Sequence, residues 1–441
     1  MNKIILSQYL EQEFETDSDA SYWFGYYNYD PLSLDSDLLL CGRIEQDGGA
    51  PQNGQTIEVG FFNTKTGDWN PINRTDSWNW QQGAMTQWLP GEKNESKIIF
   101  NTSRARHLKS IIVDIVSGET RVINWAIYGL TPDGRKSISL DLERSYWCRA
   151  YHYQSVANPE KEGRVVAGDG IFEIDLQNNT RRLIIDINDI LAMDAEEDFD
   201  KKKHWLEHIM INPSGTRFCF LHRYSSVDNV YSYKTRLFLA NIDGSGLSIV
   251  PGWENVDWSH FGWRGDNGFA IYTYQGYRHP ISGNLKNIVH SPLKLGIKLY
   301  NAFTYRYLPY SLSKKLNGKR QYYQLYSIGD NNQAKLTDTI ESSLFCIDGH
   351  PSFTTDGRYM ITDSYPDRKG YQRLIVYDTI TKKGILIAKL FAGLKGTPAS
   401  CDLHPKLSRD NQKLCVDTAY DGRHHMLVFK LNWSLISNVL K

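Results

Sequence analysis

The chain has 441 residues and carries 50 Lys and Arg against 50 Asp and Glu, so its formal net charge is zero. This balance argues against a nucleic-acid-binding protein, which is usually basic. Aromatic residues make up 13% of the chain, a content that suits packed sheets and a carbohydrate-facing surface and excludes a disordered chain.

One pattern recurs seven times: a short apolar strand, a turn rich in Pro, Ser, Asp or Gly, and a strongly apolar strand. Proline presets φ at one turn position, and Gly or Asn supplies a positive φ at another. The flanking runs alternate in polarity or are β-branched and aromatic, which is typical of strands. In chain order the copies lie at 29–37, 88–91, 127–134, 208–215, 263–268, 350–357 and 404–411.

Each copy is followed by a second predicted hairpin, for example at 113–118, 174–178, 239–244 and 376–381. Two hairpins supply four strands per repeat. Seven such repeats predict an all-β fold, a seven-bladed β-propeller of four-stranded antiparallel blades that forms a single domain over residues 1–441. The alternative is a β-sandwich or two stacked β domains, but a sandwich would not repeat the same turn seven times.

Two stretches depart from this pattern. Residues 186–200 are predicted to hold a short helix on a surface connection. Residues 276–329 contain no Asp or Glu but nine Lys or Arg, so we expect a basic insertion at about 276–325 in the fifth blade. The insertion is interpreted as a peripheral membrane or partner contact, as a basic lid over an anionic ligand, or as an ordinary solvated insertion.

The six cysteines form no CxxC pair, and several lie inside apolar runs such as 217–221. They are therefore expected to be reduced, buried thiols. The N-terminal apolar patch is too short for a signal peptide, and no apolar run reaches the length of about 18 residues that a membrane span needs. Together these features predict a cytoplasmic protein.

Five histidines lie at or near the start of innermost strands. His204 and His208 belong to the fourth repeat, and His260, His350 and His404 belong to the next three. Because the innermost strands of a propeller begin near one opening of its central channel, we expect these side chains to cluster. Convergent imidazoles suit a transition-metal site or a proton-transfer site. For each histidine the alternative is a hydrogen-bonded structural imidazole.

Other side chains at equivalent positions are candidates for binding substrate. They are Tyr27 of the first repeat, Trp80 and Gln82 of the second, and Arg223 and Arg423, which follow inner strands. An arginine can hold a carboxylate through two parallel hydrogen bonds. Either arginine could equally pair with an Asp within the fold.

Three segments carry a resemblance to a known family. The run 205–213 resembles the motif with the catalytic-base histidine of oligogalacturonate lyases, which are cytoplasmic seven-bladed propellers, and His208 falls on that histidine. The segments 259–263 and 350–353 resemble two that carry manganese ligands, here His260 and His350. This resemblance covers roughly residues 200–360. Through the runs 25–27, 78–83 and 348–353, nearly the whole chain also looks like uncharacterised propellers encoded among bacterial surface-polysaccharide genes.

The chain departs from the lyase pattern at two places. Where the family has a Gln and a His as further metal ligands, this chain has Phe345, which cannot bind a metal, and Asp348, which can. The family's catalytic Arg has no counterpart near Ile171, and Arg149 is the candidate to replace it. The expected catalytic set is therefore His208, Arg149 and His204. The expected ligands of a divalent ion, Mn²⁺ or Ca²⁺, are His260, His350, Asp348 and His404.

These observations favour a polysaccharide lyase that cleaves a uronate-containing oligo- or polysaccharide by metal-assisted β-elimination. The ion would neutralise the uronate carboxylate, His208 would remove the C5 proton, and a Tyr, a second His or water would protonate the leaving oxygen. The expected partner is thus an anionic oligosaccharide or polysaccharide and not a nucleic acid. The alternative is a non-catalytic glycan-binding or scaffold propeller in bacterial surface-polysaccharide assembly, which Phe345 and the missing Arg favour. A metal-dependent hydrolase is a third possibility.

Overall fold

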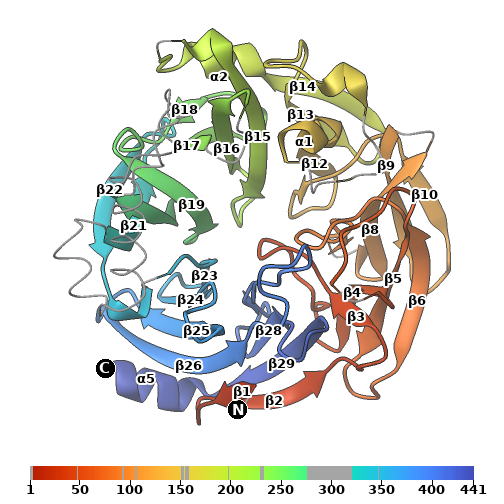
Figure 1. The fold of residues 1–441 in the computed structure, drawn as a ribbon, viewed down its shortest axis with the longest axis vertical. Coiled ribbons are helices and arrows are strands. Elements are labelled where there is room, and N and C mark those ends of the chain that lie inside the picture. The colour runs from red at the N-terminus through yellow and green to blue at the C-terminus, as the bar shows by residue number, and fades with distance from the viewer. Residues whose placement is uncertain are drawn as a thin grey trace, which may run out of the picture.

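Seven antiparallel sheets stand in a ring around a central axis, as the view down that axis shows (Figure 1). The computed structural model describes the chain except for residues 1–2, 47, 92–93, 105–106, 150–152, 154–157, 197, 229–232, 276–319 and 346. The predicted seven-bladed β-propeller is confirmed. Its blades follow one another in chain order, and the first strand of each blade lies nearest the axis.

The first three blades are each formed by four consecutive strands. The first blade consists of β3 (Ser21–Trp23), β4 (Leu38–Ile44), β5 (Ile57–Asn63) and β6 (Trp69–Thr75). The second consists of β7 (Gln87–Trp88), β8 (Lys97–Arg104), β9 (His107–Asp114) and β10 (Thr120–Ile123). The third consists of β11 (Gly129–Leu130), β12 (Lys136–Leu140), β13 (Gly170–Asp175) and β14 (Thr180–Asp186).

The next two blades follow the same plan. The fourth consists of β15 (Lys202–Ile211), β16 (Arg217–Ser226), β17 (Tyr233–Asn241) and β18 (Ser248–Ile249). The fifth consists of β19 (Val256–Trp263), β20 (Gly268–Gln275), β21 (Arg320–Ile328) and β22 (Ala334–Ile340). The predicted basic insertion follows β20, and its residues 276–319 lie outside the described residues. Its predicted end at about 325 is wrong, because residues 320–325 belong to β21 and pair with β20.

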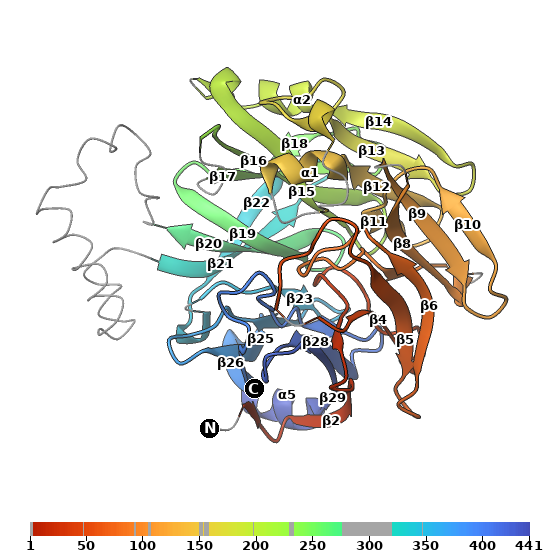
Figure 2. The same cartoon turned by 45° about the vertical axis from the view of Figure 1, so that its right-hand side comes forward.

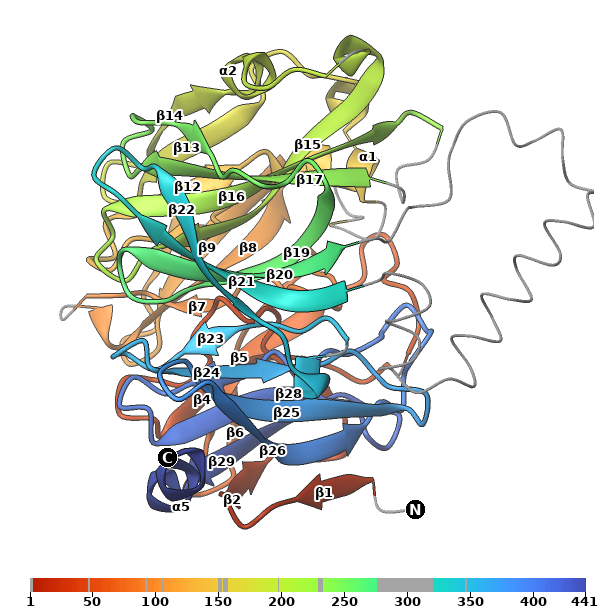
Figure 3. The ribbon, with the colours of Figure 1, turned by 90° about the vertical axis from the view of Figure 1, so that its left-hand side faces the viewer.

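The last two blades use both ends of the chain. The sixth contains β23 (Ser352–Phe353), β24 (Tyr359–Asp363), β25 (Tyr371–Asp378) and β26 (Lys383–Phe391), and β1 (Ile4–Leu6) adds a fifth strand beside β26. The seventh contains β27 (Lys406–Leu407), β28 (Lys413–Thr418) and β29 (His425–Leu431), and β2 (Leu10–Glu15) is its outermost strand. The N-terminal segment thereby closes the ring; Figure 2 shows β2 beside β29, and Figure 3 shows β1 beside β26.

The recurring turns join the first and second strands of the blades, as their sequence chemistry predicts. Gly134 shows why one of them needs glycine. Its φ is +66°, and a Cβ there would lie 2.0 Å from the carbonyl oxygen of Pro90 in the neighbouring blade. The turn residue therefore serves both its own hairpin and the close approach of two blades.

Five of the six cysteines lie in the described part of the chain, where all five are buried and free of disulfides, as predicted: Cys41, Cys148, Cys219, Cys401 and Cys415. Cys346 lies outside that part.

Helices are few among the described residues. The predicted helix within 186–200 is present as α2 (Ile187–Ala192), followed by the 3-10 turn η4 (Phe199–Lys201). Four further elements have no counterpart among the predicted ones: the helices α1 (Leu142–Cys148) and α5 (Trp433–Leu440) and the 3-10 turns η3 (Pro159–Lys161) and η6 (Ser343–Phe345). Among the described residues, no helix has the length and apolar character needed to cross a membrane.

Candidate functional site

Two β-bulges on neighbouring inner strands set the position of His208 and His260. In β15 the register of pairing with β16 shifts between Glu207 and Met210, and His208 adopts a left-handed φ of +56°. In β19 the pairing with β20 jumps between Trp258 and Phe261, a step that contains His260. A bulge re-aims side chains, and backbone strain of this kind is concentrated at functional sites.

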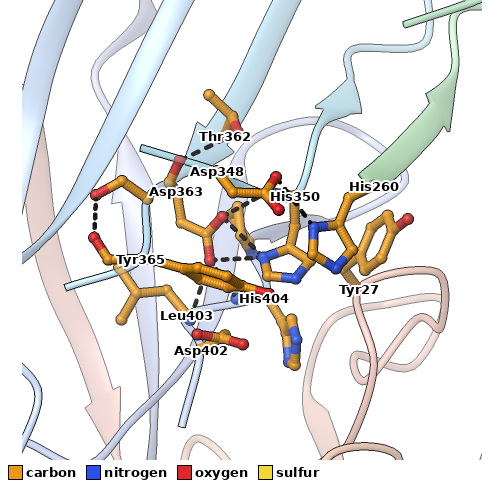
Figure 4. A network of polar contacts seen from close by, with 12 residues as sticks. Tyr27, His260, Asp348, His350, Thr362, Asp363, Tyr365, Asp402, Leu403 and His404 are labelled. Atoms are coloured by element: carbon orange, nitrogen blue, oxygen red, sulfur yellow. Dashed lines mark hydrogen bonds and ion pairs between the residues drawn. The ribbon is translucent and has the colours of Figure 1, made fainter. Parts of the chain in front are cut away.

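A single carboxylate positions His350 and His404. Asp363, the last residue of β24, accepts hydrogen bonds from the amides of His350 at 2.6 Å and of Leu403 and His404 at 3.1 Å each. Both of its oxygens also lie 3.0 Å from Nδ1 of His350 (Figure 4). His404 has a left-handed φ of +45°. The sixth and seventh blades are therefore joined at the point where each contributes a histidine.

Four histidines from four successive blades meet near the axis: His208, His260, His350 and His404, here called the axial cluster. The ring centroids of His260 and His350 are 4.0 Å apart, those of His350 and His404 4.5 Å, and those of His208 and His260 6.3 Å. None of the four is more than 6% exposed. The predicted clustering is thus present for four of the five histidines.

Two tyrosines of the first blade pack against the axial cluster. Tyr26 stacks on His208 at 5.1 Å and meets His404 edge-on at 5.1 Å. Tyr27 lies 5.0 Å from the ring of His350, and its hydroxyl donates to the carbonyl oxygen of Phe261 at 2.8 Å. Tyr27, predicted to bind substrate, is therefore next to the cluster but holds the backbone of β19.

The axial cluster contains nitrogen atoms that are free to bind a ligand. Nδ1 of His208 and Nε2 of His350 are buried and have no hydrogen-bond partner among the described residues. The ring nitrogens of His404 are also buried, and its Nδ1 lies 3.9 Å from Oδ2 of Asp417. His350, Asp402 and His404 place one nitrogen or oxygen atom each within 4.8 Å of one another. Orphaned buried nitrogens beside a carboxylate fit a divalent transition metal.

In His350 and His260, a carboxylate lies beside Nδ1, as it commonly does in histidines that bind a metal through the other ring nitrogen. Asp363 holds Nδ1 of His350, and Asp348 accepts from Nδ1 of His260 at 3.2 Å and from the Ser259 hydroxyl. Carboxylates of this kind fix ring orientation and tautomer. Of the predicted ligands, His350 and His404 come together with Asp402, whereas Asp348 supports His260.

Burial controls protonation in the cluster. It lowers the pKa of His208 to about 4 and that of His404 well below its usual range. Burial would also lower the pKa of His350, but the charge of Asp363 outweighs it and raises that pKa. Burial raises the pKa of Asp402 to about 7, although the nearby His350 opposes the shift. At neutral pH, His208 and His404 are therefore neutral and can donate a lone pair.

Two arginines converge on Glu207, the neighbour of His208. Glu207 forms a buried ion pair with Nη1 of Arg223 and lies 3.7 Å from Nε of Arg149. Both guanidinium groups lie over the ring of Tyr233, at 4.5 Å for Arg223 and 5.4 Å for Arg149. Two cations and one carboxylate give this group an excess of positive charge. Arg149 and Arg223 are thus placed beside the predicted base.

Four predicted site residues are not members of the axial cluster. His204 does not join the axial cluster, because its nitrogens contact the Phe199 carbonyl oxygen at 2.8 Å and His222 at 3.0 Å. Trp80 stacks on His424 at 4.7 Å. Gln82 is not a member of the cluster but reaches it through Tyr128: it donates to the Tyr128 hydroxyl at 3.3 Å, which lies beside the backbone of His208. The guanidinium of Arg423 donates to the carbonyl oxygen of Ser18. Each of these side chains has a partner that supports the fold.

Phe345 is a core residue. It is 1% exposed and packs against the rings of Tyr323 and Tyr377 at 5.3 and 5.4 Å. The place that holds a Gln ligand in the lyase pattern therefore supplies packing in this chain.

Glu207, Asp363 and Tyr365 were missed at the sequence level. The ring of Tyr365 lies 6.0 Å from the rings of both His260 and His350 (Figure 4). Asp363 had a signal in the repeat, because an Asp near the end of the second strand recurs as Asp417, whose Oδ2 lies 3.9 Å from Nδ1 of His404.

Fold and site together define a seven-bladed β-propeller with a histidine-rich cluster near its axis. Among solved structures it is similar to an oligogalacturonate lyase in complex with manganese, with 15% identity, a TM-score of 0.59, and coverage of 98% of this chain and 99% of the other. It is also similar to an oligogalacturonate lyase from Vibrio parahaemolyticus, with 13% identity, a TM-score of 0.58 and 98% coverage of each chain. No protein-family model and no curated protein matches the chain significantly. At these identities the similarity concerns the fold.

Proposed function

We propose that the protein is a metal-dependent lyase that cleaves a uronate-containing oligo- or polysaccharide by β-elimination. The observation that carries this proposal is the axial cluster, in which buried imidazole nitrogens without partners lie beside a carboxylate. The similarity of the fold to oligogalacturonate lyases, one of them a manganese complex, supports it.

His208 is the proposed base. Its ring is neutral near pH 7, because burial lowers its pKa to about 4, and its Nδ1 has no partner among the described residues. A neutral imidazole with a free lone pair can accept the proton from C5 of the uronate. Tyr26, stacked on the ring, holds its plane.

His350, Asp402 and His404 are the residues that would hold the ion. When bound, a divalent cation supplies positive charge that neutralises the uronate carboxylate and makes the C5 proton more acidic. Asp363 keeps Nδ1 of His350 occupied, so that Nε2 remains for the ligand. Manganese is the proposed ion, because a mixed imidazole and carboxylate set is compatible with it and a structurally similar lyase is a manganese complex.

Arg149 and Arg223 favour an anionic substrate. Both lie beside the carboxylate of Glu207, and their guanidinium groups therefore place positive charge next to the proposed base. A guanidinium can hold a carboxylate through two parallel hydrogen bonds. Uronate residues of an oligosaccharide would supply such groups.

The second candidate is a non-catalytic glycan-binding or scaffold propeller. Phe345 favours it, because this side chain packs in the core and cannot bind a metal where the lyase pattern has a ligand. A binding protein would retain oligosaccharide affinity without producing an unsaturated sugar.

The experiment that tests the proposal follows the ultraviolet absorbance of unsaturated product from uronate-bearing glycans in the presence of Mn²⁺. We expect activity that a chelator abolishes and Mn²⁺ restores, and that His208→Ala lowers by about 100-fold or more. His107→Ala is the matched control, because this side chain is 66% exposed and belongs to the second blade. Binding without product on any uronate glycan would favour the second candidate instead.

A further inference from the structure

We propose that Glu207 is a positioning residue that fixes His208 in the tautomer with hydrogen on Nε2, leaving Nδ1 as the proton-accepting atom. The role of that atom as a base rests on the proposed lyase function. Oε2 of Glu207 lies 3.3 Å from Nε2 of His208, and both side chains are buried.

The bulge in β15 makes this contact possible. Successive side chains of a regular strand point to opposite faces, so adjacent residues do not normally meet. At Glu207 the register with β16 shifts by one residue, and the φ of +56° at His208 turns its side chain. Two residues that are neighbours in sequence thereby become partners in space.

Glu207 is itself held rigidly. Trp205 Nε1 donates to its Oε1 at 2.8 Å, Arg223 forms an ion pair with its Oε2, and Arg149 lies near Oε1. Burial alone would raise the pKa of Glu207, but Arg149 and Arg223 hold that pKa well below its usual range. An ionised carboxylate can only accept hydrogen bonds, so the nitrogen facing it must carry the hydrogen.

The other nitrogen of His208 is left without a partner. Nδ1 is buried and makes no hydrogen bond to a described residue, which costs free energy unless a ligand satisfies it. The stacked ring of Tyr26, tilted by only 13° from that of His208, limits rotation of the imidazole. Glu207 and Tyr26 together therefore hold His208 so that the lone pair of its Nδ1 has a defined direction.

The first measurement is the tautomer itself. Nitrogen NMR of ¹⁵N-histidine-labelled protein at pH 7, assigned by the loss of signal in His208→Ala, should show hydrogen on Nε2 of His208 and a bare Nδ1. Hydrogen on Nδ1 would overturn the proposal. The tautomer can be measured in a protein without lyase activity. If the protein is inactive but His208 carries its hydrogen on Nε2, the proposed lyase function is wrong and the positioning role of Glu207 is still supported.

The second measurement uses Glu207→Gln, which replaces one accepting oxygen by a donating amide. We expect kcat to fall about 100-fold, because the orientation of the base is lost. Glu207→Asp should recover part of the activity.

Glu173→Gln is the matched control. Glu173 is also a buried, ion-paired glutamate, held by Lys136 and Arg182 in the third blade. If the natural protein is active and the two variants Glu207→Gln and Glu173→Gln have the same kcat, Glu207 has no positioning role. If Glu207→Gln does not fold, the tautomer of the unmodified protein decides the matter.

Discussion

Asp363 is the residue on which the candidate metal site depends most. It receives hydrogen bonds from three backbone amides and from the His350 ring, and it is 2% exposed. Asparagine has the same shape but only one accepting oxygen. Replacing Asp363 by asparagine therefore removes one of its two accepting oxygens, although several N–H donors surround this side chain.

We expect Asp363→Asn to lower the affinity for Mn²⁺ by about 10- to 100-fold, the usual cost of losing a carboxylate behind a histidine ligand. Isothermal titration calorimetry of the folded protein measures it. Asp338→Asn, which removes an exposed ion pair with Lys382, is the control. Equal affinities in both variants would show that Asp363 has no part in metal binding.

At the scale of the element, the connection between β14 and β15 is fastened to the fourth blade by a directional hydrogen-bond chain. Arg236 Nε donates to Nδ1 of His222 at 3.1 Å, Nε2 of His222 contacts Nδ1 of His204 at 3.0 Å, and Nε2 of His204 contacts the carbonyl oxygen of Phe199. Each imidazole must be neutral, because each Nδ1 faces a donor. His204, expected to be catalytic, belongs to this structural chain.

Acid should loosen this connection. Burial lowers the pKa of His204 from 6.5 to about 4, so the unfolded chain binds this proton more readily than the native state does. Its contribution to stability is complete above pH 6.5 and is lost as the pH falls toward 4. By linkage the loss for His204 is about 2 kcal/mol at pH 5.

Urea unfolding at pH 8 and pH 5 measures this effect. The double variant His204→Leu/His222→Leu should be less stable at pH 8 but should lose less stability on acidification than the natural chain. The same loss in both proteins would mean that these histidines do not titrate on unfolding.

At the scale of the whole molecule, the ring is closed by β2 from one end of the chain and β27 to β29 from the other. Closure holds the seventh blade, which carries His404, against the first, which carries Tyr26 and Tyr27. An unpaired β29 would also leave an open sheet edge.

Removal of residues 1–15 should therefore lower the free energy of unfolding by about 5 kcal/mol, from roughly six strand hydrogen bonds and the burial of Leu10. Removal of residues 1–7 is the control, since it takes only β1 and leaves the sixth blade with four strands. Thermal unfolding measures both. Equal melting temperatures for the two truncations would contradict a closing role for β2.

The sequence by itself determined the architecture and the principal histidines. The recurring turns depend on local chemistry, such as the left-handed φ of Gly134, and seven of them with paired hairpins leave few all-β folds other than a propeller. Because equivalent positions of the blades meet near the axis, the register of His208, His260, His350 and His404 was sufficient to predict their clustering.

Only the tertiary structure decided which of these side chains work together. His204 and His208 are four residues apart and would share a face in a regular strand, but the bulge at His208 inverts that alternation and separates them. The partners Glu207 and Asp363 depend on contacts across a bulge and between blades. No local pattern encodes such contacts, because they arise only when the ring brings the inner strands together.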